Sequence, residues 1–258
     1  MDALRRSFNE VAEIYDATRP GYPAAVFDDI AAAATLGPGG RILEIGCGTG
    51  QATRGFAGRG CPILAIDPGP ELIRLAARNL ADHPQIELRN CSFEALPPQP
   101  GAFKLIFAAQ AWHWVEPGQG FAKAADALAP DGVLAIFGHV PVGLLPASLD
   151  EAFQAILHTQ FGPSAAPPER WYLPDGPVPG LIAASGRFDV RAHKAYPWRR
   201  QHDTASFLAL MRSRSDIQTL PAEIRERLLA AYADAIAAAG GRFDMLSETH
   251  VHLACRTS

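Results

Sequence analysis

The sequence predicts an α/β fold: a doubly wound, mostly parallel sheet of seven strands with an inserted cap of helix and loop. Between residues 36 and 140, five apolar runs alternate with segments of helical periodicity, which is typical of a parallel sheet with helices on both faces. After residue 186, two segments alternate apolar and polar side chains, as half-buried strands do. We see no internal repeat and no second core, so we expect one domain over residues 1–258.

The chain opens with two predicted helices within residues 7–35. The first shows apolar residues at helical spacing up to Tyr15, and the second begins at Pro23, which suits a first helical position. The break between them, residues 19–23, reads RPGYP. We expect residues 1–35 to form a helical lead-in to a core over residues 36–140.

The next element is a glycine-rich turn. Residues 42–50 read ILEIGCGTG, and a helix-compatible segment follows over residues 51–59. Glycine suits such a turn because it adopts backbone angles that other residues avoid, and because it lets a ligand approach the backbone closely. The stretch predicts a buried strand, a tight turn and a helix start that present the backbone to a ligand.

An acidic residue ends the second apolar run. Asp67 follows residues 61–66 and lies 21 positions after Gly46, where it is placed to accept hydrogen bonds from both hydroxyls of a ribose. A dinucleotide fingerprint would need a third glycine where Gln51 stands. A pyrophosphate would also suit the nearby carboxylate of Glu44 poorly, whereas a cationic cofactor would tolerate it. An NAD(P)-dependent oxidoreductase therefore stays open as the less favoured alternative.

The other elements follow from periodicity and from turn residues. Strand segments alternate with helical stripes, and glycine or proline separates them. The predicted elements are helix 70–80, strand 86–92, strand 103–109, a helix ending near residue 128, strand 133–137, helix 148–161, strand 188–198, helices 203–213 and 221–239, and strand 251–255.

A proline-rich segment lies in the predicted cap. Residues 162–180 contain six prolines, and Trp171 and Tyr172 lie within the segment. A long aromatic loop in a compact domain is more often a lid or a substrate wall than a linker. We therefore expect residues 141–186 to form a cap or lid, and residues 187–258 to form closing antiparallel strands and helices.

Three motifs resemble those of a known family. The spacing E-x-G-x-G-x-G over residues 44–50 resembles the signature of class I S-adenosylmethionine-dependent methyltransferases, here of the type 11 group. The lead-in at 19–23 and the QAWHW cluster at 110–114 are similar to the trans-aconitate methyltransferase-like branch. The resemblance covers about residues 8–140. It implies a Rossmann-like fold with the last strand inserted antiparallel beside the fifth, S-adenosyl-L-methionine as cofactor and S-adenosyl-L-homocysteine as product.

The resemblance also implies cofactor contacts. In the family the lead-in folds over the cofactor, with its tyrosine and arginine near the methionine carboxylate, a group that a bidentate arginine suits. Residues 91–96 resemble the family's adenine-cradling segment, although Ser92 replaces the usual aspartate. The alternatives are a core Tyr15, a surface Arg19 and a core Phe93. The expected cofactor-binding residues are Tyr15, Arg19, Glu44, Gly46, Cys47, Gly48, Gly50, Asp67, Pro68, Ser92, Phe93 and Gln110.

The cluster after strand 103–109 is expected at the mouth of the site, because ligands bind beyond the carboxyl ends of parallel strands. Methyl transfer needs mainly proximity and orientation, and a hydroxyl or amine acceptor also benefits from a base. His113 is the candidate catalytic base. The alternative is that His113 only hydrogen-bonds the cofactor or the backbone. The expected substrate-contacting residues are Trp112, Trp114, His139, Trp171 and Tyr172, with one of the first two in the core.

Composition narrows the classes of partner. A net charge of −4 and the absence of a basic cluster argue against nucleic acid. Four widely spaced cysteines suggest neither a disulfide framework nor a zinc site, and we expect no metal at His250 and His252. There is no signal peptide and no apolar run of about 18 residues, so a cytoplasmic protein without a membrane span is expected. The sequence does not indicate an oligomeric state.

Together these patterns predict an S-adenosylmethionine-dependent methyltransferase that acts on a small-molecule acceptor through a carboxyl, hydroxyl or ring atom. A non-catalytic protein that binds S-adenosylmethionine or S-adenosylhomocysteine is the alternative from another class.

Overall fold

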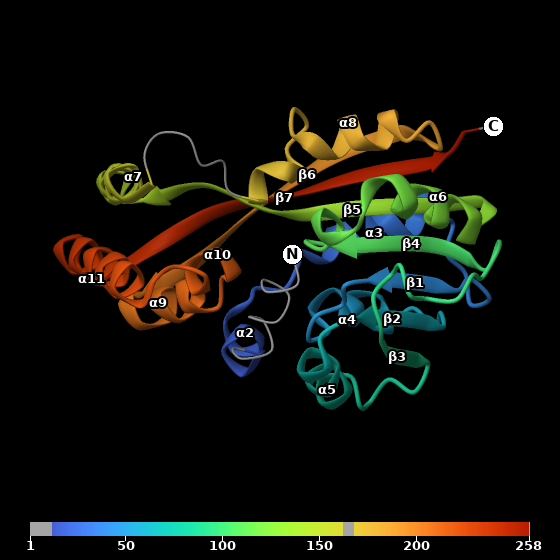
Figure 1. Cartoon of the computed structure of the whole chain (residues 1–258), viewed down its shortest axis with the longest axis horizontal. Coiled ribbons are helices and arrows are strands. Elements are labelled where there is room, and N and C mark those ends of the chain that lie inside the picture. The colour runs from blue at the N-terminus through green and yellow to red at the C-terminus, as the bar shows by residue number, and fades with distance from the viewer. Residues whose placement is uncertain (1–11, 162–167, 258) are drawn as a thin grey trace. The chain divides into compact units, whose positions relative to one another are not determined.

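The computed structural model describes residues 12–161 and 168–257 (Figure 1). The chain divides into two compact units. Unit 1 comprises Met1–Arg19, Pro141–Pro167 and Pro197–Glu248, and unit 2 comprises Pro20–Val140, Pro168–Tyr196 and Thr249–Ser258. The expected cap, residues 141–186, is therefore divided between the two units: residues 141–167 belong to unit 1 and residues 168–186 to unit 2.

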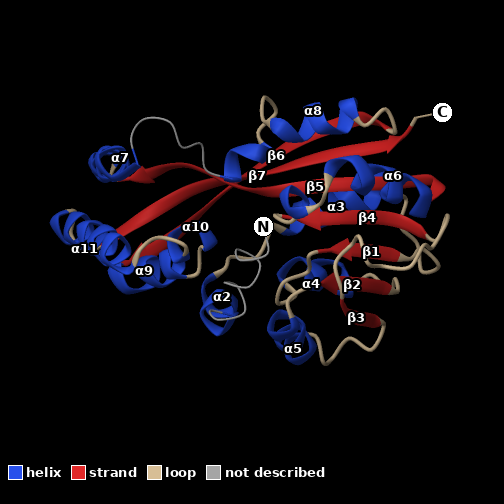
Figure 2. Cartoon of the chain, viewed as in Figure 1, coloured by secondary structure: helices blue, strands red, loops and turns tan. Residues whose placement is uncertain are grey.

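Unit 2 contains the strand and helix alternation that the sequence predicts. Parallel strands β3, β2, β1 and β4 lie side by side in that order (Figure 2). The elements are α3 (Ala24–Ala33), β1 (Ile42–Ile45), α4 (Gln51–Ala57), β2 (Ile63–Asp67), α5 (Pro70–Asn79), β3 (Ile86–Asn90), β4 (Phe103–Ala109) and α6 (Pro117–Ala127).

Three longer strands complete the sheet, and the division between the two units falls within each of them. They are β5 (Leu128–Leu145), β6 (Phe188–Asp203) and β7 (Arg242–Arg256). The sheet order is β3-β2-β1-β4-β5-β7-β6, so the last strand lies beside the fifth, as expected. β7 runs toward the labelled C-terminal end, opposite to β5 (Figure 1). The strand order reverses between β1 and β4, and ligands of open α/β sheets bind at such a switch point.

Both faces of the parallel strands β1, β2 and β4 are largely buried, which explains their continuous apolar runs, whereas the edge strand β3 is partly exposed. Because side chains alternate along a strand, Leu43 and Ile45 pack in one cluster with α6, whereas Ile42 packs in another with Phe27 of α3 and Phe56 of α4. Helices therefore cover the two faces, and the doubly wound fold is confirmed.

Unit 1 packs helices around an aromatic core. Its helices are α2 (Ala12–Thr18), α7 (Ala147–Phe161), α9 (Thr204–Arg212), α10 (Ser215–Gln218) and α11 (Ala222–Ala238). The core contains the rings of Phe153, Phe207, Tyr232 and Phe243. The expected helices 148–161, 203–213 and 221–239 are confirmed within one or two residues; residues 7–11 of the first expected helix lie outside the described residues.

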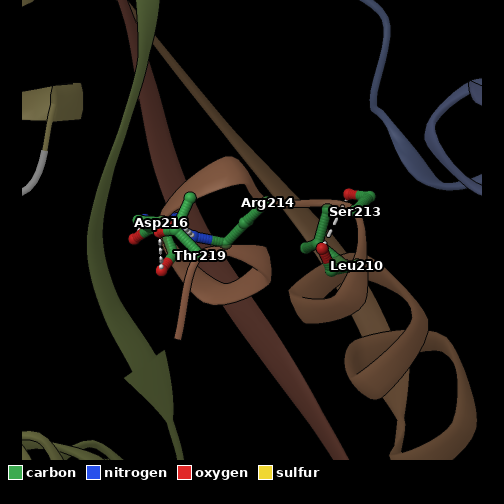
Figure 3. A network of polar contacts seen from close by, with 5 residues as sticks. All are labelled: Leu210, Ser213, Arg214, Asp216 and Thr219. Carbon is green, nitrogen blue, oxygen red and sulfur yellow. Dashed lines mark hydrogen bonds and ion pairs between the residues drawn. The ribbon is translucent and has the colours of Figure 1, made fainter. Parts of the chain in front are cut away.

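The turn from α9 into α10 was not expected from periodicity, and local hydrogen bonds hold it (Figure 3). Arg214 makes two contacts with the carboxylate of Asp216, at 3.0 and 2.8 Å. The hydroxyl of Ser213 donates to the carbonyl of Leu210 at 2.7 Å, and that of Thr219 donates to the carbonyl of Asp216 at 3.1 Å. Because side-chain bonds to nearby backbone hold this turn, its sequence does not show the regular spacing of apolar residues that indicates a helix.

The loop expected over residues 162–180 is wrong for much of its described part. A 3-10 helix spans Pro168–Tyr172, and helix α8 spans Pro177–Ala184; residues 162–167 lie outside the described residues. Proline is tolerated in the first turn of a helix, because the N–H that it lacks has no partner there. Here Pro168 and Pro177 begin helices.

Candidate active site

The glycine loop after β1 has the backbone conformation that only glycine adopts readily. Gly46, Gly48 and Gly50 have φ angles of 72°, 56° and 93°. The N–H groups of Gly46 and Cys47 both donate to the carbonyl of Ile66, at 2.8 and 3.0 Å. The loop is therefore fastened to the end of β2.

Asp67 holds the glycine loop and the turn after β2 together. One carboxylate oxygen accepts from the N–H of Gly48 at 3.0 Å, and the other accepts from the N–H of Gly69 at 2.8 Å. The side-chain amide of Asn90 donates to the carbonyl of Asp67 at 2.9 Å. A carboxylate offers about four acceptor positions, so two backbone donors are compatible with further hydroxyl donors. Gly69 and Asn90 were not expected from the sequence, because neither stands in a recognised motif.

Glu44 is a buried carboxyl in the middle of the sheet. Its Oε2 lies 2.5 Å from the Thr53 hydroxyl, and its Oε1 is buried without a hydrogen-bond partner among the described residues. Burial raises the pKa of Glu44 to about 8; the hydrogen bond from Thr53 lowers it and the charge of Asp67 raises it. Glu44 is therefore mainly protonated at neutral pH.

The glycine loop touches the segment that follows β4. A Cβ built on Gly46 would lie 2.4 Å from the Cβ of Ala111. That close approach puts the loop against the start of the QAWHW cluster. The two motifs, 60 positions apart in the sequence, meet at the carboxyl ends of β1 and β4, as expected for one site.

Gln110 makes the bend between β4 and the segment that bears His113. Its φ of 53° lies in the left-handed region, which is uncommon for residues other than glycine and is frequent at functional sites. Its N–H donates to the carbonyl of Phe137 at 2.8 Å, and its side-chain amide donates to the carbonyl of His139 at 3.3 Å. The bend leads directly into a 3-10 helix, Trp112–Trp114.

Aromatic residues gather around His113. Its Nδ1 lies 3.1 Å from the Tyr172 hydroxyl, and its ring centre lies 4.8 Å from that of Trp114 and 5.9 Å from that of Trp171. His113, Trp114 and Trp171 are partly exposed, whereas Tyr172 is buried. The structure thus brings together four of the expected catalytic and substrate residues from two distant segments.

Trp112 and Phe93 lie in the core. Trp112 is 1% exposed, with its ring centre 4.8 Å from that of Phe121 and 6.5 Å from that of Phe93. Phe93 is also buried. Of the two tryptophans beside His113, Trp112 is therefore the core residue, because the 3-10 turn points consecutive side chains in different directions.

His139 lies at the end of the buried part of β5. Its Nδ1 lies 2.9 Å from the Thr249 hydroxyl, and its ring stacks on Tyr22 at 4.3 Å between centres. Tyr22 also packs edge-on against Phe137. Thr249 and Tyr22 were not predicted as site residues; for Tyr22 the only signal was its place in the lead-in motif.

The other expected cofactor residues have local roles. Ser92 accepts from the N–H of Ala95 at 3.3 Å, and Pro68 is exposed. Cys47 is buried, and burial raises the pKa of its thiol well above the usual value. Tyr15 and Arg19 belong to unit 1, where the guanidinium of Arg19 lies 4.8 Å from the ring centre of Tyr15, so their role at the cofactor stays a prediction.

Among residues 12–161 and 168–257, no group of three or more His, Cys, Asp or Glu side chains could hold a metal ion. Within the same described ranges, no helix has the length and apolar character needed to cross a membrane.

Comparison with known proteins shows what part of this chain resembles. Residues 42–132 match the family described as "Methyltransferase domain". An uncharacterized methyltransferase of Mycobacterium tuberculosis is 32% identical over 130 residues, which are 50% of this chain and 51% of that protein. The chain thus spans about half the length of that relative. An uncharacterized methyltransferase-like protein of Schizosaccharomyces pombe is 27% identical over 230 residues, covering 88% of this chain and 84% of that protein.

A solved structure supports the fold. A protein of Anaeromyxobacter dehalogenans, presented as a candidate type II methyltransferase, matches with a TM-score of 0.70 at 24% identity, covering 92% of this chain and 97% of that one. The trans-aconitate methyltransferase-like branch stays a prediction. Residues 42–132 thus resemble a methyltransferase domain, and the sheet order and the glycine loop agree with the fold of class I S-adenosylmethionine-dependent methyltransferases.

Proposed function

We propose that this protein transfers the methyl group of S-adenosylmethionine to a small-molecule acceptor, with His113 as general base. The observation that carries the proposal is the contact between Gly46 and Ala111, because it joins the cofactor loop to the segment that bears His113. When bound, the cofactor supplies a methyl group already activated on a cationic sulfur.

The residues around the glycine loop fit this cofactor. The carboxylate of Asp67, held by the N–H groups of Gly48 and Gly69, is suited to accept from ribose hydroxyls. Gly48 carries no side chain, which suits close approach of a ligand to the backbone of the loop. The unpartnered Oε1 of Glu44 is a buried polar atom beside the loop, and a cationic ligand would favour the ionised form of this carboxyl, which could then accept a hydrogen bond.

His113 is placed to move a proton. We assign Nε2 as the atom that takes the proton from the acceptor, since Nδ1 faces the Tyr172 hydroxyl. A neutral imidazole is an effective base near neutral pH, and such a base contributes about 10²- to 10⁴-fold to a rate. A hydroxyl or amine acceptor would use this base, whereas a carboxylate acceptor would not need it.

The side chains beside His113 favour a flat acceptor. Trp114 and Trp171 are partly exposed. They come from two different segments of the chain, and both rings lie near that of His113. Indole rings stack on planar or apolar groups and attract cations over their faces. We therefore give Trp114 and Trp171 the roles of acceptor contacts and Trp112 a packing role, whereas His139, which is buried against Tyr22, stays only a sequence-based prediction.

The test is a methyl-transfer screen. Protein is incubated with methyl-labelled S-adenosylmethionine and a panel of phenols, small amines and carboxylic acids, and both labelled product and S-adenosylhomocysteine are measured. We expect transfer to a planar hydroxyl or amine compound. Tight cofactor binding without transfer to any member of the panel would instead support a non-catalytic binding protein.

A further inference from the structure

Two contacts on opposite ends of Tyr172 connect His113 to a histidine of the last strand. The Tyr172 hydroxyl lies 3.1 Å from Nδ1 of His113. The carbonyl of the same residue lies 2.8 Å from Nε2 of His252. His113 and His252 are 139 positions apart in the sequence, and Tyr172 lies between them.

The protonation of His252 follows from its surroundings. A carbonyl can only accept, so Nε2 of His252 carries a proton and donates it to Tyr172. Nδ1 of His252 is buried and has no hydrogen-bond partner among the described residues. Burial lowers the pKa of His252 to about 4, so the ring is neutral around pH 7. The ring is therefore a fixed donor to the backbone of Tyr172.

The ring of Tyr172 is fixed as well. It lies against the backbone of β5, because a Cβ built on Gly138 would be 2.5 Å from the tyrosine ring. Tyr172 is 1% exposed. With its carbonyl held by β7 and its ring against β5, the hydroxyl of Tyr172 has little freedom to move away from His113.

We propose that His252 is a positioning residue that acts through Tyr172 to fix the tautomer and orientation of His113. In this arrangement His113 carries its proton on Nδ1 and donates it to the Tyr172 oxygen, and Nε2 is the basic nitrogen. The inference rests on the proposed role of His113 in methyl transfer. The tautomer of a histidine is set by the hydrogen bond of its other nitrogen, so a lost partner changes which nitrogen is basic.

His193, a neighbouring histidine, provides the matched control. Nε2 of His193 lies 2.9 Å from Nδ1 of His250, and the rings of His193 and His252 lie 4.8 Å apart. His193 is exposed, and its Nε2 faces the ring of His250. Its replacement should disturb the cluster without altering the bond between His252 and Tyr172.

The experiment is nitrogen NMR of the imidazole rings in protein labelled with [15N]histidine, with the His113 signals identified by their loss in His113→Gln. Wild type and His193→Gln should both show His113 with the proton on Nδ1. Tyr172→Phe should raise the fraction with the proton on Nε2 by at least threefold. His252→Asn, whose amide is too short to replace Nε2, should also raise the fraction of His113 that carries its proton on Nε2. His252→Gln, whose amide reaches the position of Nε2, should keep that fraction at the wild-type value.

The proposal is overturned if folded His252→Asn protein, judged by near-ultraviolet circular dichroism, keeps the wild-type tautomer of His113. It is also overturned if wild-type His113 carries its proton on Nε2. If His252→Asn does not fold, the tautomer of His113 is compared among wild type, Tyr172→Phe and His252→Gln. The proposal expects the Gln variant to match wild type, and a Gln variant that instead matches Tyr172→Phe contradicts the expected rescue. None of these measurements uses methyl transfer, so a failed acceptor screen with the expected tautomers would reject only the proposed function.

Discussion

The backbone N–H of Gly48 donates a hydrogen bond of 3.0 Å to the carboxylate of Asp67. The two features that the sequence assigns to one cofactor, the glycine loop and the acid at the end of the second strand, are therefore a single hydrogen-bonded unit. A change at either residue should alter both the contact with the ligand and the shape of the loop.

The first prediction concerns this unit. Asp67→Ala removes an acceptor of two backbone bonds, and Gly48→Val places a branched side chain at a φ of 56°. Each should weaken binding of S-adenosylmethionine at least about tenfold by titration calorimetry, since hydrogen bonds to charged groups contribute roughly 1.5–3 kcal/mol. Asp82→Ala, an exposed change between α5 and β3, is the control and should bind as wild type does. Unchanged affinity in both site variants would reject the assignment.

The second prediction concerns the close approach of Gly46 and Ala111. Gly46→Ala should lower the free energy of unfolding by about 3 kcal/mol, because its Cβ would collide with Ala111 and its φ is 72°. Adding Ala111→Gly should recover part of the loss, giving a coupling of roughly 1 kcal/mol or more in urea unfolding. Gly58→Ala, which has open space around it, should change stability by about 0.5 kcal/mol or less. Purely additive effects would contradict the contact.

The third prediction concerns Glu44. Its pKa is about 8 in the folded protein and near 4.5 in the unfolded chain, so the folded state binds more protons between these values and stability falls as pH rises through that window. In Glu44→Gln this loss should be absent. Between pH 5 and pH 8 the wild type should lose on the order of 3 kcal/mol more than the variant in urea unfolding. Parallel pH profiles would mean that Glu44 is ionised in the folded protein.

The fourth prediction concerns acid stability in unit 1. His202 is 1% exposed and stacks on Phe243, and burial lowers its pKa to about 4. The unfolded chain binds the proton more readily between pH 6.5 and pH 4, so stability falls as pH drops through this window. His202→Phe should reduce the loss between pH 6.5 and pH 5 by on the order of 2 kcal/mol, measured by urea unfolding at both values. An equally steep loss in the variant would show that other groups cause it.

The fifth prediction concerns turnover. With an acceptor from the screen, His113→Ala should lower kcat about 10²-fold or more while calorimetry shows unchanged affinity for S-adenosylmethionine. His158→Ala, exposed on α7, is the matched histidine control and should keep wild-type turnover. A loss below about threefold at His113 would indicate that it only hydrogen-bonds its neighbours.

The sequence predicts well what depends on local pattern. The buried parallel strands appear as apolar runs, and the left-handed turn after β1 appears as three glycines, because each follows from the residues at that place. Seen from the sequence, Trp112 and Trp114 are equivalent; only the 3-10 turn after Gln110 separates the core side chain of Trp112 from the partly exposed one of Trp114.

What the sequence could not give is contact between distant segments. His252 looks like one more residue of an alternating strand, and its bond to Tyr172 depends on the insertion of β7 beside β5. Helix α8 was missed because prolines normally indicate a loop, although they are equally compatible with a helix start. Nothing in their spacing distinguishes the two cases.

The left-handed backbone of Gln110 has a consequence for other chains. A residue with a branched Cβ would be strained there, whereas glycine or asparagine adopts the bend more readily, and Gln110 adopts it in this chain. Relatives with the same bend should therefore carry one of those residues directly after the fourth strand, and relatives with valine or isoleucine should have a different backbone conformation there. The residue at this single position could thus be used to sort related sequences by the backbone geometry after their fourth strand before any of them is crystallised.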